Sequence, residues 1–198
     1  MNKRRFSTAD LCYIGAMCAI SVVLRMLLEI PMVFLAPWLK LDLSYVPMLL
    51  TGFALGPVPG LFVLTLTNVI QLFASDSGMV GQLADFLAGL CFLLPATIIY
   101  HHCHTRRGAV IGMAVGTVLL IVGAILINLN ILFPLYFGGD YADKLTSVGF
   151  SSVTNCVIAA VIPFNLIKGV VVSGVTFVLY KRLSRLLRRA EKKEGNKK

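Results

Sequence analysis

The chain has 198 residues, of which 58% are hydrophobic and only 14% are charged, and its mean hydropathy is +0.86. Soluble domains carry about 25% charged residues, so this composition argues against a soluble globular protein, a disordered chain and a secreted disulfide scaffold, and indicates a polytopic membrane protein. The net charge is +9, and 14 of the 18 Lys and Arg residues lie at 3–5, 106–107 and 181–198 beside apolar segments. This distribution is typical of cytoplasmic loops and argues against nucleic-acid binding.

Apolar segments in chain order predict six transmembrane helices. The first ends before Pro31, and a loop with Lys40 and Asp42 follows it. The next apolar block has no charged residue but is interrupted by Gly56-Pro57-Val58-Pro59-Gly60, a strong helix break. That block forms either two short helices that each cross the membrane or a pair of re-entrant helices that do not. Packing favours two helices that each cross. The predicted helices cover residues 8–29, 44–56, 60–75, 80–102, 108–132 and 158–185.

The basic residues indicate the orientation of the chain in the membrane. Both ends are basic, so the positive-inside rule places both in the cytoplasm and requires an even number of crossings. The predicted fold is therefore an all-α integral membrane protein: a single domain over 1–198 with six transmembrane helices and a basic cytoplasmic tail at 181–198. The segment 133–157 is long for a loop and fits a partial helix or a flap on the outer face.

Polar side chains inside the apolar segments are the candidate functional residues, because burying them in a membrane is costly. A rise of about 1.5 Å per residue places them in the outer half of four helices, where they would line an outward-facing pocket for a polar small molecule. Carboxamides suit such a pocket because each supplies donors and an acceptor. In the alternative reading, the amides bond one another across helices and the lysine pairs with Asp85 or extends to the surface. The residues are Asn68, Gln71, Asp85, Asn128, Asn130, Asn165 and Lys168.

Two further patterns involve charged and small residues. Arg25 and Glu29 are four residues apart, a spacing that favours an ion pair on a helix surface. Gly15 and Ala19 form a row of small residues on the first helix, and such rows let helices approach closely, either within the chain or on a partner membrane protein. A second row consists of Gly52, Gly56 and Gly60.

Common enzymatic motifs do not occur in the sequence. Without G-x-x-x-x-G-K-[ST] the chain is not expected to use ATP itself. The cluster His101-His102-Cys103-His104 lacks the usual spacing of metal ligands, and the carboxylates form no D-x-x-D or H-E-x-x-H pair. We therefore expect neither an enzyme nor a metal site.

Three motifs of the sequence are Lys40-Leu-Asp-Leu-Ser-Tyr-Val-Pro47, Gly52-Phe-Ala-Leu-Gly-Pro57 and Val80-Gly-Gln-Leu-Ala-Asp-Phe86. They resemble motifs of the substrate-binding S components of energy-coupling factor (ECF) vitamin transporters, and the third is similar to the GELANF-type start of the fourth helix in that family. Asn128 followed by Pro134-Leu-Tyr136, together with Pro163-Phe-Asn-Leu-Ile-Lys168, is most similar to the riboflavin-specific branch. The similarity covers approximately residues 8–185.

The resemblance implies a pocket that the loop between the first two helices closes, with riboflavin or a related flavin as transported ligand and no resident cofactor. Asn128, Asn165 and Lys168 match positions that hold the flavin, and Asp42 matches a loop position near it. Gln82 and Asp85 depart from the pattern, because glutamate and asparagine are common there. The candidate walls for the flavin ring are Phe86, Phe164, Tyr136 and the loop aromatics Phe34 and Trp38.

The resemblance also implies partners. Ala19, with Gly15 in place of the usual alanine, matches a row that docks on the ECF transmembrane T subunit, which carries two ATP-binding cassette ATPases. The expected location is a bacterial cell membrane. One alternative is an S component for another vitamin or cofactor precursor, and another, of a different class, is a small membrane-embedded enzyme.

Overall fold

The computed structural model describes residues 7–36, 38–74, 78–138 and 141–195, with side chains as far as Tyr180. The basic clusters predicted to be cytoplasmic, at 3–5 and in the tail at 181–198, lie outside the described side chains. The described part is almost entirely helical, so the predicted all-α class is confirmed. The helices are α1 (Thr8–Leu27), α2 (Tyr45–Leu55), α3 (Pro57–Gln71), α4 (Gly78–Cys103), α5 (Arg106–Ile127), α6 (Phe133–Phe137), α7 (Tyr141–Ser147), α8 (Val153–Cys156) and α9 (Ile162–Gly195).

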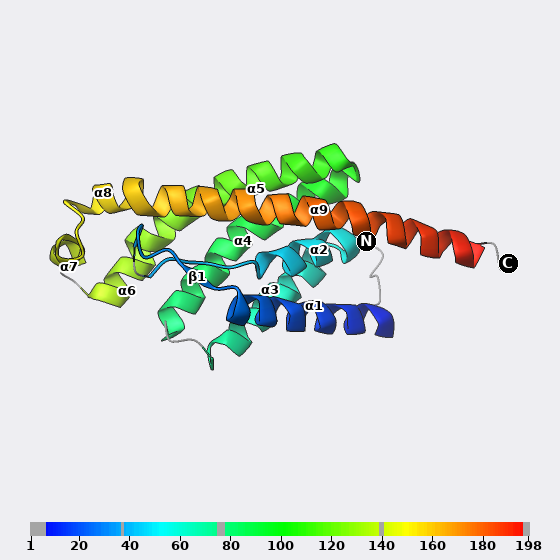
Figure 1. Ribbon diagram of the computed structural model, residues 1–198, viewed down its shortest axis with the longest axis horizontal. Helices are drawn as coiled ribbons and strands as arrows, with labels where there is room; N and C mark the ends of the chain where they lie inside the picture. Colours follow the sequence, from blue (N-terminus) through cyan, green and yellow to red (C-terminus); the bar gives the residue numbers. More distant parts are fainter. Residues whose placement is uncertain (1–6, 37, 75–77, 139–140, 196–198) are drawn as a thin grey trace.

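The helices pack side by side into an elongated bundle. In Figure 1, α9 runs beside α5 along most of the molecule, α1 lies on the opposite side, and α2 lies between α1 and α9. Two π-helical turns, η1 (Asn128–Leu132) and η2 (Val157–Val161), extend α5 and precede α9. One short antiparallel ladder joins β1 (Ile30–Pro31) to β2 (Lys40–Leu41).

Four helical stretches in the described residues are long and apolar enough to span a membrane: Thr8–Leu27, Met79–Cys103, Arg106–Phe137 and Val153–Tyr180. The helices α2 and α3 are also apolar, but they have only 11 and 15 residues. A full crossing takes roughly 20 residues. The six crossings and the cytoplasmic position of both chain ends therefore stay predictions.

The predicted helix break is formed by Gly56 and Pro57. Gly56 has a φ of +119°, which glycine adopts without steric cost, and Pro57 is the first residue of α3, where a missing N–H breaks no helical hydrogen bond. The two helices then pack closely, because a Cβ on Gly60 would lie 3.0 Å from the Cα of Gly52. Gly52 and Gly60 of the small-residue row therefore serve packing within the chain, whereas Gly56 serves the turn between the two helices.

A hairpin and a set of short helices close one end of the bundle. The hairpin pairs Ile30 with Leu41 and Pro31 with Lys40. The segment 133–157 forms α6, α7, α8 and the intervening turns, whose buried side chains make one apolar cluster. Trp38 from the hairpin joins this cluster, with its ring centroid 5.3 Å from that of Phe137. In Figure 1 these elements lie at the end of the molecule away from the start of α1 and the end of α9.

Candidate functional site

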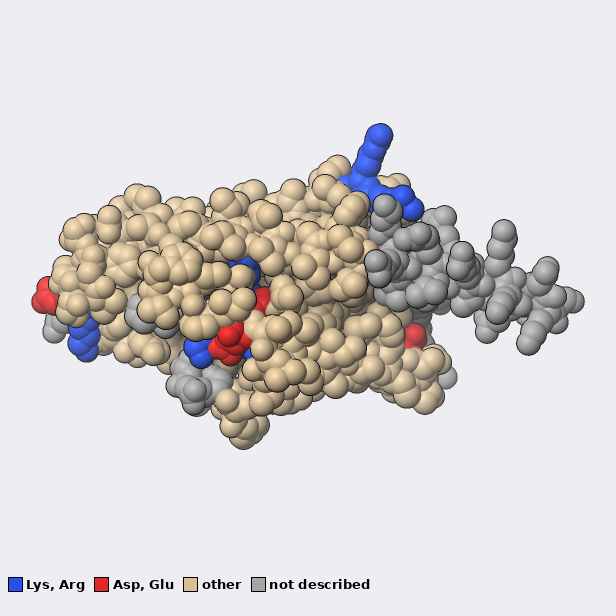
Figure 2. All heavy atoms as spheres, in the orientation of Figure 1, with Lys and Arg blue, Asp and Glu red and all other residues tan. Residues whose placement is uncertain are grey.

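A cavity of about 260 Å³ lies between α1, the hairpin and the adjacent parts of α3, α4, α5 and α9. Figure 2 shows Lys, Arg, Asp and Glu atoms gathered near the middle of a face that is otherwise nearly uncharged. Most of the predicted site residues line this cavity. They are Asp42, Gln71, Asp85, Asn128, Asn165 and Lys168.

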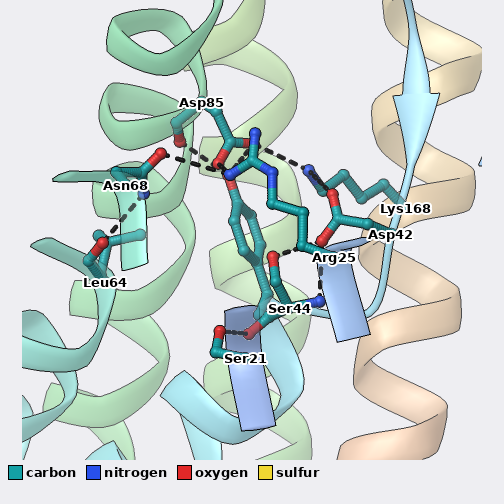
Figure 3. Close-up of polar contacts among 9 residues, drawn as sticks. Ser21, Arg25, Asp42, Ser44, Leu64, Asn68, Asp85 and Lys168 are labelled. Carbon is teal, nitrogen blue, oxygen red and sulfur yellow. Dashed lines mark hydrogen bonds and ion pairs between the residues drawn. The ribbon is translucent and has the colours of Figure 1, made fainter. Parts of the chain in front are cut away.

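Four charged side chains from separate parts of the chain meet at the cavity (Figure 3). The carboxylate of Asp85 on α4 lies between two cations, with Oδ2 at 2.8 Å from Nη1 of Arg25 and Oδ1 at 3.0 Å from Nζ of Lys168. Lys168 also lies 3.4 Å from Oδ2 of Asp42. The four side chains are at most 13% exposed, and their formal charges cancel.

Tyr45 at the start of α2 supports this cluster. Its hydroxyl donates to the carbonyl oxygen of Asp85 at 2.8 Å and lies 3.0 Å from the Asp85 carboxylate. The ammonium group of Lys168 lies 4.1 Å from the centre of the Tyr45 ring, a cation–π contact that gains strength when it is desolvated. Tyr45 therefore contacts both members of the Asp85–Lys168 ion pair.

Asp42 is fixed at the end of the hairpin by its neighbours. The backbone N–H of Ser44 donates to Asp42 Oδ1 at 2.8 Å, and the Ser44 hydroxyl donates to the same oxygen. The hydroxyl of Ser21 on α1 donates to the Ser44 carbonyl at 2.7 Å. Figure 3 shows these contacts linking α1 to the loop and the loop to Lys168 on α9.

The asparagines of the site bond to their own helices. Nδ2 of Asn128 donates to the carbonyl of Ala124 at 2.7 Å, and Nδ2 of Asn165 donates to that of Val161 at 2.8 Å. The π-helical turn η1 begins at Asn128, and η2 ends at Val161; such turns are frequent at functional sites. No bond between two amide side chains occurs in the described residues, so the cross-helix amide pairs of the alternative reading are wrong there, whereas its pairing of Lys168 with Asp85 is confirmed.

Four cavity-lining side chains hold a buried polar atom that has no hydrogen-bond partner in the described structure. The donors are Nε1 of Trp38 and Nε2 of Gln71, and the acceptors are Oε1 of Gln82 and Oδ1 of Asn128. An unsatisfied buried polar group costs about 1–3 kcal/mol. The site is therefore suited to a molecule that brings both donors and acceptors into the cavity.

The other two candidate residues, Asn68 and Asn130, do not line the cavity. The Oδ1 of Asn68 accepts from Arg25 at 3.4 Å, and its Nδ2 donates to the Leu64 carbonyl at 3.0 Å. Asn68 instead lines an apolar groove between α3 and α4, together with Phe86. Asn130 is exposed and bonds back to Leu126, so it faces away from the site.

The candidate ring walls are divided between the cavity and the surface. Trp38 and Phe164 line the cavity. Phe86 lies at the apolar groove, and Tyr136 and Phe34 are 49% and 77% exposed. The cavity therefore has aromatic walls from the hairpin and from α9.

The predicted ion pair between Arg25 and Glu29 is wrong. Arg25 binds Asp85, and Oε1 of Glu29 lies 2.6 Å from Nζ of Lys40. The Asp85 side chain is 13% exposed and that of Glu29 is 30% exposed, so the Asp85 carboxylate is less screened by solvent and is the stronger partner for the Arg25 guanidinium, which is 12% exposed. Sequence reasoning missed Arg25 as a site residue, although a cation inside an apolar helix was the signal that could have found it.

Outside the cavity, the histidine cluster and the small-residue row occupy different surroundings. His101 Nε2 lies 3.0 Å from the carbonyl of Gly52, and no group of three or more potential metal ligands occurs in the described part of the chain. Gly15 and Ala19 are exposed on α1, and a Cβ built on Gly15 would meet nothing within 4 Å. This face of α1 is thus open to a partner helix.

Comparisons with known proteins agree over most of the chain. The family model of the ECF transporter substrate-specific component matches residues 10–180. The riboflavin transporter RibU of Staphylococcus aureus (strain TCH60) is 36% identical over 180 residues, which cover 89% of this chain and 90% of the relative. The riboflavin transporter FmnP of Bacillus subtilis (strain 168) is 30% identical over 176 residues, covering 87% of this chain and 90% of the relative.

A solved structure shares the fold. It is described as "Structure and mechanism of the S component of a bacterial ECF transporter" and superposes with a TM-score of 0.75 at 35% identity, covering 90% of this chain and 97% of that chain.

Proposed function

The chain belongs to the substrate-specific (S) components of ECF transporters, and on that premise we propose that it is the riboflavin-binding subunit of a vitamin uptake transporter. Both curated relatives described above carry the name riboflavin transporter. The family consists of transporter components, so the chain is not an enzyme. Its part in transport is to capture the ligand and present it to a separate energising module.

The observation that carries the proposal is the convergence of Asn128, Asn165 and Lys168 on one cavity. A flavin has a flat ring system with one edge of alternating carbonyl and N–H groups. Two carboxamides and an ammonium group provide donors and acceptors for that edge. Phe164 and Trp38 line the same cavity and would cover the apolar faces of the ring.

We further propose that the chain crosses a bacterial plasma membrane six times with both ends in the cytoplasm. The cavity is lined by residues near the ends of α1, α3 and α5 and near the starts of α4 and α9, so with both chain ends in the cytoplasm the site would face outward. The hairpin that carries Asp42 closes the cavity on that side. Asp42 and Lys168 are 3.4 Å apart, which ties the hairpin to α9 when no ligand separates them.

The energy for transport would come from partner subunits. The sequence has no ATP-binding motif of its own. The open face of α1 around Gly15 and Ala19 would pack on the T subunit of an energising module that carries two ATP-binding cassette ATPases. Small residues at such a face let the helix backbones approach closely.

Titration of detergent-purified protein against riboflavin, followed by flavin fluorescence quenching, tests the proposal. Asn165→Ala should raise the Kd about tenfold, because one buried hydrogen bond is lost. Asn130→Ala is the matched control, since its side chain also donates to the carbonyl four residues earlier at 2.8 Å but is exposed. Absence of quenching by the wild type would refute the proposal, and equal losses in both variants would refute the role of Asn165.

The second candidate is an S component for a different vitamin. Gln82 and Asp85 support this second candidate. Both line the cavity, and both differ from the residues that are common at their positions in the family. Competition assays distinguish the two candidates: unlabelled riboflavin must displace any other vitamin at equimolar concentration if riboflavin is the cognate ligand.

A further inference from the structure

The tip of the hairpin exposes an uncharged apolar surface. No charged residue occurs from Ile30 to Leu39, and in Figure 1 the hairpin runs beyond the end of α1. The exposed fractions of three apolar side chains are 56% for Ile30, 64% for Val33 and 77% for Phe34. Apolar side chains gathered in this way indicate a surface that contacts a membrane or another molecule.

The other side of the same hairpin is buried on the bundle. Ala36, Leu39 and Leu41 are at most 8% exposed and share an apolar cluster with Phe164 of α9. Leu39 and Phe164 also line the cavity. The hairpin therefore has one side that covers the cavity and another that faces away from the bundle.

Polar groups of the hairpin are paired within the chain. Nζ of Lys40 lies 2.6 Å from Oε1 of Glu29, so the charges on either side of the tip compensate each other. The backbone N–H groups of Leu35 and Ala36 donate to the carbonyl of Met32 at 2.8 and 3.1 Å. A segment whose charges and backbone groups are paired internally can lie where water is scarce.

The apolar surface of the tip continues the surface of α1. The candidate membrane span Thr8–Leu27 ends just before the hairpin, and Met26 and Leu27 at its end are 62% and 76% exposed. Side chains exposed on such a span face the acyl chains of lipids. The hairpin tip follows at the level where acyl chains give way to headgroups, a level at which aromatic and large aliphatic side chains are favoured.

We propose that Ile30, Val33 and Phe34 insert into the boundary between lipid headgroups and acyl chains at the cavity end of the bilayer. The molecule on this surface is membrane lipid, and the hairpin that covers the cavity is thereby anchored in the bilayer. In this position the hairpin holds Asp42 3.4 Å from Lys168. The anchor therefore favours the state in which the cavity is covered and should slow ligand release, a consequence that rests on the proposed riboflavin-binding function.

Depth-dependent fluorescence quenching in lipid nanodiscs tests the position of the tip without any ligand. Trp38 is the one tryptophan of the sequence, so Trp38→Phe gives a background in which Phe34→Trp or Val33→Trp is the reporter. Both reporters should lose more fluorescence to phospholipids brominated near the headgroup than to phospholipids brominated near the chain ends. Ile20→Trp, inside the α1 span, should show the reverse order, and Thr146→Trp, exposed on α7, should be quenched by neither.

Two results of this experiment would overturn the proposal. Reporters at positions 33 and 34 that neither lipid quenches would place the tip in water or against another protein. Reporters that follow the order of Ile20→Trp would place it in the acyl-chain core and not at the boundary. Agreement between the two tip reporters guards against a local disturbance by either substitution.

The effect of the anchor on the cavity is measured in nanodiscs with Trp38 kept. Phe34→Asn should accelerate riboflavin dissociation about 3- to 10-fold, because the hairpin loses its largest apolar contact with lipid. Phe34→Leu, which keeps an apolar side chain, should stay within about twofold of the wild type. Equal rates in all three proteins would overturn the anchoring role. A wild type that binds no riboflavin would refute the proposed function itself, whereas the quenching result would still decide where the tip lies.

Discussion

Removal of one partner of the buried ion pair between Arg25 and Asp85 should strongly destabilise the fold, and Arg25→Met tests this. The Arg25 guanidinium lies 2.8 Å from Asp85, and the two side chains are 12% and 13% exposed. Without Arg25, Asp42 and Asp85 share Lys168 as their only remaining cation in the cluster. Breaking one partner of a buried pair costs about 3–5 kcal/mol. Because Asp85 keeps its contacts with Tyr45 and Lys168, we expect about 3 kcal/mol.

A double-mutant cycle isolates the electrostatic part of this loss. Asp85→Asn alone leaves Arg25 and Lys168 with Asp42 as the only anion of the cluster, so it should also destabilise. The double variant Arg25→Met/Asp85→Asn leaves a neutral Lys168–Asp42 pair, and should lie within about 1 kcal/mol of the wild type if the two charges compensate each other. The free energy of unfolding is measured by denaturant titration in mixed micelles.

The control is the ion pair at the mouth of the cavity. Lys40 and Glu29 are 2.6 Å apart but are 40% and 30% exposed, so solvent screens them and Lys40→Met should cost only about 0–1 kcal/mol. A loss for Lys40→Met as large as that for Arg25→Met would show that burial does not set the magnitude. A double variant less stable than both single variants would refute the compensation of Arg25 and Asp85.

Two further predictions concern α1. Ser21→Ala removes the hydrogen bond to the Ser44 carbonyl, of 2.7 Å, and should raise the riboflavin Kd about 3- to 10-fold because the loop carboxylate loses its support; unchanged affinity would contradict this. Gly15→Leu or Ala19→Leu should leave ligand affinity intact and abolish riboflavin uptake by cells. The control is Gly174→Leu on α9, where a Cβ also meets nothing within 4 Å, and this variant should keep its uptake. Uptake that survives both α1 substitutions would exclude docking through this face.

The general architecture could be predicted from the sequence because it depends on local patterns. Long apolar segments predict helices, and a cluster of proline and glycine predicts the break at Gly56, where α2 gives way to α3. The short helices α6 to α8 could not be predicted in the same way. They are held by contacts with Trp38, which is about a hundred residues away in the chain, and no local periodicity reports such a contact.

The sequence predicted most residues of the site, but it did not predict which of them bind one another. Heights along the helices indicated that Asn128, Asn165 and Lys168 lie at similar depth, and the structure places all three at one cavity. Helical spacing suggested Glu29 as the partner of Arg25, because that spacing is the only pairing rule that works within one helix. The partner that the structure gives, Asp85, is 60 residues away.

Charge balance would have limited the choices more than spacing did. In a membrane an uncompensated charge is so costly that ionised groups in apolar segments must pair with one another. The helices carry Arg25, Asp85 and Lys168 at the site, so this set needs one more anion, which Asp42 at the end of the hairpin supplies. Neutrality would therefore have predicted a second carboxylate at the site, from Glu29 or Asp42, although it would not have revealed which cation holds which carboxylate. That last step depends on the close approach of α1, α4 and α9, which only the folded chain supplies.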